Sequence, residues 1–230
     1  MQTHARTLYT ETDLALTARF GGGFSSHQPE FLMDLILEPA KIQDRLARQC
    51  DALIERYRLL HEALGDYTFC AVFADDLGTQ NAPMLSPDLF AEAIAPHYRR
   101  FADWLHADTN WQLYLHSCGA IEPLIETLID VGVDILNPIQ TSAAGMDPTE
   151  LKRKYGGRIV FWGGGCDTQS VLGFRSPEEI ADHVRDRIRV FAPGGGFVFN
   201  QVHVIQPNVP PEHICAMFDT ARQCGTYPIR

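Results

Sequence analysis

The sequence contains no run of roughly 18 uninterrupted apolar residues, the length that a helix needs to cross a membrane. Its first residues lack the apolar core of a secretory signal. Positive charge is also scarce, with 19 Lys and Arg against 29 Asp and Glu and a formal net charge of -10. These absences predict a cytoplasmic protein that binds neither a membrane nor a nucleic-acid backbone.

The cysteines are few and are not framed at the short spacings of a disulfide scaffold. In a chain without a secretory signal they are expected to be reduced thiols, and a cysteine near a histidine then more often indicates a metal or catalytic site than a disulfide. The six positions are Cys50, Cys70, Cys118, Cys166, Cys215 and Cys224.

Short apolar runs alternate with longer amphipathic runs through five cycles, which predicts five βα units and a parallel sheet covered by helices. Helix starts are marked by an N-cap residue followed by proline, as in Ser86-Pro87, Asp147-Pro148 and Ser176-Pro177. The segments 29–37 and 39–64 are also expected to be helical, with no strand before them. The expected strands are residues 67–73, 111–115, 133–136, 158–162 and 196–199.

Nucleotide-binding glycine loops are missing, which favours a barrel over an open doubly wound sheet. Neither glycine triplet, residues 163–165 or 194–196, has the spacing of a dinucleotide or Walker loop. A complete (β/α)8 TIM-type barrel has eight strands and about 250 residues. We therefore expect residues 1–230 to form a single α/β barrel domain that is incomplete, truncated at its N-terminus by roughly three βα units.

Polar side chains gather at the expected strand ends, where a barrel places its functional groups. His116 and Cys118 alternate along a strand end and so share a face, and imidazole and thiolate are good zinc ligands. His203 and Cys166 follow later strands and are further candidate ligands. A set of three ligands leaves one position open, as a catalytic zinc requires. The alternative readings are a packed cysteine and a hydrogen-bonded loop histidine.

Other strand-end residues are candidates for acid–base chemistry, for orienting a metal-bound histidine or for substrate contacts. Asp167, His203 and Asp76 are the expected catalytic residues, although a carboxylate at a strand end can equally serve as a structural cap. The expected substrate-binding residues for a small-molecule substrate are Asp75, Asn137, Gln140, Gln169, Asn200 and Gln201.

At this level of detail the chain resembles the C-terminal two-thirds of the uroporphyrinogen decarboxylase superfamily. The resemblance covers roughly residues 5–225, and its most specific part is the segment 199–212 with its Asn, His and Pro-Glu spacing. The supporting segments are Asp75-Asp76-Leu77-Gly78, His116-Ser117-Cys118-Gly119, Gly164-Gly165-Cys166-Asp167-Thr168-Gln169 and residues 199–212.

The resemblance implies one of two chemistries. One branch of the superfamily decarboxylates uroporphyrinogen without a metal and uses an arginine-rich N-terminal segment that is not found here. The other contains zinc-dependent methyltransferases that move a methyl group between a corrinoid and a thiol, and their His-x-Cys motif matches His116 and Cys118. Their third ligand, generally cysteine, falls on His203, which leaves room for Cys166 as a substitute.

Three functions are therefore expected, in descending order. The first is zinc-dependent methyl transfer with a corrinoid carried on a partner protein. The second is a decarboxylase of the uroporphyrinogen type or a tetrapyrrole binder in porphyrin biosynthesis. The third is a non-catalytic remnant or half of a split enzyme, whose open sheet edge and exposed apolar surface would favour pairing, for example as a homo-oligomer.

Overall fold

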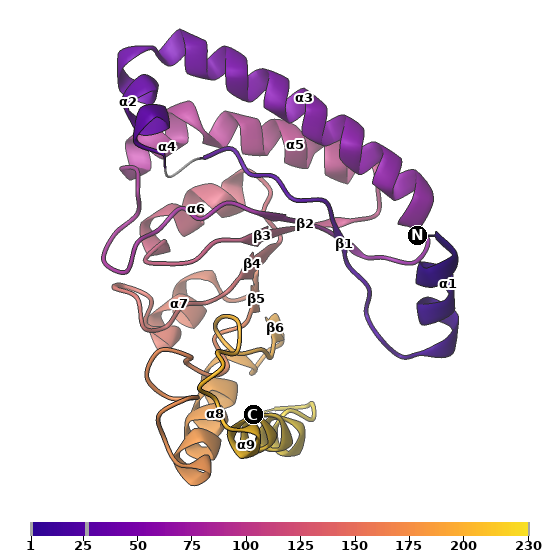
Figure 1. The fold of residues 1–230 in the computed structure, drawn as a ribbon, viewed down its shortest axis with the longest axis vertical. Coiled ribbons are helices and arrows are strands. Elements are labelled where there is room, and N and C mark those ends of the chain that lie inside the picture. Colours follow the sequence, from indigo (N-terminus) through magenta and orange to yellow (C-terminus); the bar gives the residue numbers. More distant parts are fainter. Residues whose placement is uncertain (1, 26–27, 230) are drawn as a thin grey trace. The chain divides into compact units, whose positions relative to one another are not determined.

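The computed structural model describes residues 2–25 and 28–229, in which strands and helices alternate along most of the chain (Figure 1). The strands follow one another in the sheet in chain order, and every strand pairing whose register is given is parallel. The predicted parallel α/β fold is thus confirmed. The strands are β1 (Ala18–Arg19), β2 (Cys70–Ala74), β3 (Gln112–His116), β4 (Ile135–Asn137), β5 (Val160–Trp162) and β6 (Phe197–Val198).

The helices begin where the capping residues predicted. The side chains of Ser86, Asp147 and Ser176 each accept a hydrogen bond from the first turn of the following helix, and Ser176 forms a reciprocal capping box with Glu179. No helix in the described ranges is both long and apolar enough to cross a membrane. The helices are α1 (Gln2–Glu11), α2 (Pro29–Leu37), α3 (Pro39–Leu64), α4 (Pro87–Ala93), α5 (Ala95–Asp108), α6 (Glu122–Asp130), α7 (Pro148–Tyr155), α8 (Pro177–Phe191) and α9 (Pro211–Cys224).

Two expectations about secondary structure were wrong. A strand, β1, does precede the first predicted one, but its two residues are too short to give a periodic pattern. The amphipathic stretch after Ser86 is two helices rather than one, because α4 ends before Ile94 and α5 restarts with Pro96 in its first turn. Proline cannot donate the backbone hydrogen bond that a continuous helix would need there.

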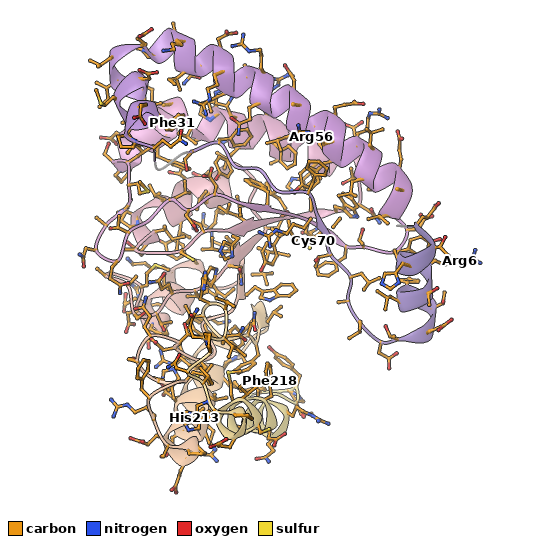
Figure 2. All side chains as sticks on the ribbon, viewed as in Figure 1. Arg6, Phe31, Arg56, Cys70, His213 and Phe218 are labelled. Carbon is orange, nitrogen blue, oxygen red and sulfur yellow. The ribbon has the colours of Figure 1, made fainter. Side chains whose placement is uncertain are left out.

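The chain divides into two compact units, which are described separately. Unit 1 carries β1 to β3, helices α1 to α5 and most of α6. Its core is aromatic: Phe73 of β2 packs against Tyr98 and Phe101 of α5, at ring separations of 5.4 and 5.6 Å. On its outer helices, Arg56 of α3 covers the ring of Phe20, and Phe31 of α2 lies under another arginine (Figure 2).

Unit 2 carries β4 to β6 with α7 to α9, together with the loops at residues 78–83 and 117–123. Helices α8 and α9 lie side by side (Figure 1) and contribute to an apolar cluster. Phe199, after β6, lies 6.3 Å from the half-exposed ring of Phe218 on α9 (Figure 2). The buried members of the cluster are Cys166, Leu172, Ile180, Val184, Ile188, Ala192 and Met217.

Candidate metal site at the strand ends

Three of the predicted ligands come together: His116, Cys118 and His203. One ligand atom from each, a ring nitrogen or the thiol sulfur, can be chosen so that all three lie within 4.8 Å of one another. Within the described residues, no other group of three or more His, Cys, Asp or Glu side chains meets the same test. His116 and Cys118 are half-buried and His203 is exposed, so the group is accessible to a ligand from solvent.

The donor set suits zinc. Imidazole nitrogen and thiolate sulfur bind zinc at about 2.0–2.3 Å, which places tetrahedral ligand atoms roughly 3.3–3.7 Å apart. Separations of up to 4.8 Å are therefore close enough for small side-chain rotations to complete the site. Three protein ligands leave one tetrahedral position open.

The loop that carries Cys118 is held by backbone contacts to a second loop, residues 78–83. Gly119 has a φ of +94°, and a Cβ atom there would lie 2.5 Å from the carbonyl carbon of Gly78. Only glycine fits both the left-handed backbone and this close approach. The amide of Ala120 donates to the carbonyl of Thr79 at 2.8 Å, which joins the two loops.

Gln140 and Gln169 contact the same region of unit 2. The Gln140 side chain is buried; its Oε1 accepts from the Gly119 amide at 2.8 Å and its Nε2 donates to Gln80 at 2.9 Å. Gln169 reaches the same Gln80 oxygen at 3.4 Å. Sequence reasoning missed Gln80, whose only signal was a polar residue in the loop that follows β2.

Asn137 forms hydrogen bonds that link neighbouring strands of the sheet. Its Nδ2 donates to the carbonyl of Trp162 at 2.9 Å, and its backbone carbonyl accepts from the Ser117 amide. Both contacts join the ends of neighbouring strands. The structure thus places Asn137 at the strand ends, as expected, and employs its side chain in linking β4 to β5.

Cys166 lies apart from the three-residue group. It is fully buried in the apolar cluster of α8 and α9, and burial raises the pKa of its thiol to about 12. A thiol in such surroundings stays protonated at neutral pH, whereas a zinc ligand must be a thiolate. The geometry therefore favours His203 over Cys166 as the third ligand.

Asp167 shapes the loop after β5. Its Oδ1 accepts from the amides of Gln169 and Ser170 at 2.6 and 2.9 Å, which is the pattern of a capped turn. Its own amide donates to Nε2 of His183 on α8 at 3.4 Å. Burial and then the nearby Arg187 lower the pKa of His183, which keeps the ring neutral and able to accept.

Asp75 is a buried carboxylate in unit 1 whose oxygens are engaged within the protein. It accepts from the amides of Phe24 and Ser25, from the Ser25 hydroxyl and, at 2.7 Å, from the hydroxyl of Tyr98. Burial and then the Asp75 charge raise the pKa of Tyr98 well above its usual range. This carboxylate anchors the segment after β1, and Asp76 beside it is half-buried.

Asn200 and Gln201 continue β6 toward His203. The carbonyl of Asn200 accepts from the Gly165 amide at 2.8 Å, and Gln201 forms a parallel bridge with Cys166. The Oε1 atom of Gln201 is buried without a hydrogen-bond partner. These contacts extend the pairing of β6 with the loop after β5.

Comparisons with known proteins agree with the fold. The model of the family described as uroporphyrinogen decarboxylase (URO-D) matches residues 14–224. A uroporphyrinogen decarboxylase from Magnetococcus marinus is 26% identical over 113 residues, which are 49% of this chain and 29% of that protein. One from Alkalilimnicola ehrlichii is 31% identical over 134 residues, 58% of this chain and 33% of that protein. In these alignments the chain spans about a third of the length of its curated relatives.

Among solved structures, a methyltransferase from Methanosarcina mazei aligns with a TM-score of 0.72 over 98% of this chain and 64% of that one. The sequence identity is 17%, so the likeness concerns the fold alone. It identifies the architecture as a TIM-type (β/α) barrel, of which the described residues form six strands.

Proposed function

The chain belongs to the uroporphyrinogen decarboxylase family, and from this premise we propose that it is a zinc-dependent methyltransferase acting between a corrinoid and a thiol. The observation that carries the proposal is the grouping of His116, Cys118 and His203. A decarboxylase of this family would need no such set of nitrogen and sulfur donors. The solved methyltransferase with the same fold is consistent with the proposal.

The residues would divide the work as follows. His116 and His203 would bind zinc through ring nitrogens and Cys118 through its sulfur, and the open fourth position would take the substrate thiol. When bound, zinc would lower the pKa of that thiol and so supply a thiolate nucleophile at neutral pH. In the overall reaction a carbon–sulfur bond would form, the bond between the methyl group and the corrinoid cobalt would break with its electron pair left on cobalt, and the thiol proton would pass to solvent. The corrinoid would be carried by a partner protein.

The second candidate is metal-free decarboxylation of a porphyrinogen, and it is favoured by the names of the curated relatives. In this reading Asp76, Asp167 and His203 would contact the substrate as acid–base groups. It predicts turnover of uroporphyrinogen that survives chelation. The two candidates therefore differ in their response to metal removal.

Metal analysis of the protein purified without added zinc tests the first candidate. We expect about one equivalent of zinc in the wild-type chain and less than about a tenth in Cys118→Ser, because a lost thiolate leaves only two protein ligands. Cys215→Ser, which changes an exposed thiol on α9, is the matched control and should retain the metal. A wild-type chain with less than about a tenth of an equivalent, unchanged in Cys118→Ser, would contradict the proposal.

Activity separates the two candidates directly. Transfer of methyl from methylcobalamin to a small thiol should fall to background in Cys118→Ser and after chelation, and return when zinc is restored. Uroporphyrinogen turnover that persists in the presence of a chelator and is lost in Asp167→Asn would instead support the decarboxylase.

A further inference from the structure

Three loops of unit 2 meet at the backbone amide that follows Cys118. Gly119 donates to Oε1 of Gln140 at 2.8 Å, and Nε2 of Gln140 donates to Oε1 of Gln80 at 2.9 Å. Nε2 of Gln80 in turn donates to the carbonyl of Ser142 at 2.6 Å. We call this chain of Gly119, Gln140, Gln80 and Ser142 the amide relay.

The relay has a single self-consistent direction. Its first member, the Gly119 amide, can only donate, and its last, the Ser142 carbonyl, can only accept. Each glutamine must therefore present oxygen toward Gly119 and nitrogen toward Ser142, because flipping either amide would place two donors or two acceptors face to face. A backbone group at each end thus locks both side-chain amides.

The hydrogen bond between the Gly119 amide and Gln140 is buried. Gln140 is 8% exposed and the Gly119 amide lies in a buried segment, so an unpaired group at this contact would have no water to replace its partner. Gln80 also accepts an amide hydrogen bond on its backbone carbonyl, from Ala144 at 3.0 Å. The residue at the centre of the relay is therefore held through both its side chain and its backbone.

We propose that Gln140, supported by Gln80, is a positioning residue that holds the loop carrying Cys118 in its metal-binding conformation. The contact is made one residue away from the sulfur-bearing position, and His116 is only two residues further back along the chain. Gln140 touches neither metal nor substrate; it acts through the backbone of the loop. The inference rests on the proposed function for the metal, but the restraint on the loop is measurable without it.

Hydrogen exchange at the Gly119 amide in the metal-free protein tests the restraint. Gln140→Met keeps the length of the side chain but removes the acceptor, so exchange at Gly119 should quicken at least tenfold. Gln140→Glu keeps an acceptor for Gly119 and replaces the donor to Gln80 by a second acceptor, so it should restore most of the protection at Gly119. Gln223→Met, on the exposed face of α9, is the matched control and should change nothing. Equal effects of Met and Glu at position 140 would indicate packing and overturn the proposal.

The affinity of the site for Co²⁺ ions, used in place of zinc, tests what the restraint on the loop does to metal binding. Loss of a group that orients metal ligands typically weakens affinity by about 10- to 100-fold, and we expect a loss in that range for Gln140→Met and none for Gln223→Met. The thiolate-to-cobalt absorption band should weaken in parallel. Unchanged affinity with faster Gly119 exchange would overturn the positioning role. A wild-type chain that binds no cobalt would contradict the proposed function instead, and the exchange measurement would still decide whether Gln140 restrains the loop.

Discussion

The loop after β3 and the loop after β5 each place a cysteine next to glycine at the end of a parallel strand, yet the two thiols meet different surroundings. Cys118 is half-buried and close to two imidazoles, whereas Cys166 is fully buried among apolar side chains with a pKa of about 12. The same residue type at the same kind of position is a candidate ligand in one loop and core in the other. The packing around each thiol makes the difference.

The two loops are also held by different chemistry. The amide relay that holds the loop after β3 consists of uncharged groups. The loop after β5 is capped by the Asp167 carboxylate and joined to α8 through His183, a titratable residue whose pKa is lowered by burial and by the nearby Arg187. Changes of backbone, of polarity and of pH should therefore affect the two loops unequally.

Replacing glycine by alanine should give the largest difference in the free energy of unfolding between the two loops. Alanine at Gly119 would combine a positive φ, costing about 1–2 kcal/mol, with overlap against the backbone of Gly78, costing about 1–3 kcal/mol. Alanine at Gly164, in the loop after β5, would share the positive φ but would meet the Cβ atom and the carbonyl oxygen of Ile139 at 2.9 and 3.0 Å, a milder overlap than at Gly119, and should cost less. Urea unfolding measures both. Gly157→Ala, which has a positive φ but open space around the added Cβ atom, measures the backbone cost alone. A Gly119→Ala variant that is no less stable than Gly157→Ala would contradict the close contact between Gly119 and the backbone of Gly78.

Replacing the buried thiol of Cys166 by a hydroxyl should have an intermediate effect on the free energy of unfolding. Cys166→Ser places a hydroxyl in the apolar cluster and should lower the free energy of unfolding by about 1–3 kcal/mol while leaving the zinc content unchanged. Urea unfolding and metal analysis of the same sample measure the two quantities. Loss of zinc in Cys166→Ser would show that Cys166 is a ligand after all and would remove the contrast between the loops.

Lowering the pH should have the smallest effect on the free energy of unfolding, and this effect should arise in the loop after β5. Burial lowers the pKa of His183 in the folded state, whereas in the unfolded chain it is about 6.5. Between these two values the unfolded chain binds more protons, so the free energy of unfolding falls as the pH drops below about 6.5. His183→Gln, which keeps an acceptor for the Asp167 amide, should remove part of this slope in unfolding experiments between about pH 7 and pH 5.

A control for this titration comes from unit 1. Burial also lowers the pKa of His97, so His97→Gln should reduce the slope in the same direction. Only His183→Gln should change the pH dependence of hydrogen exchange at residues 166–170. An identical response of this loop to both variants would show that its stability does not depend on His183.

Much of the fold could be predicted because its signals are local. Capping side chains at Ser86, Asp147 and Ser176 mark helix starts through contacts three residues apart, and a proline marks the first residue of both α2 and α3. The two-residue strand β1 has no such signal, since only its parallel pairing with β2 makes it a strand. Short elements that depend on a distant partner are the ones that sequence patterns miss.

The same distinction between local signals and distant partners applies to the candidate site. The sequence by itself determined which residue types stand at strand ends, including His116, Cys118 and His203, because strand ends are marked by local patterning. Only the tertiary structure decided that these three converge while Cys166 packs against α8 and α9, and that Gln80 reaches Gln140 from a loop 60 residues away. The reason is physical: burial and long-range hydrogen bonds depend on how separate segments pack, and no local pattern encodes that packing.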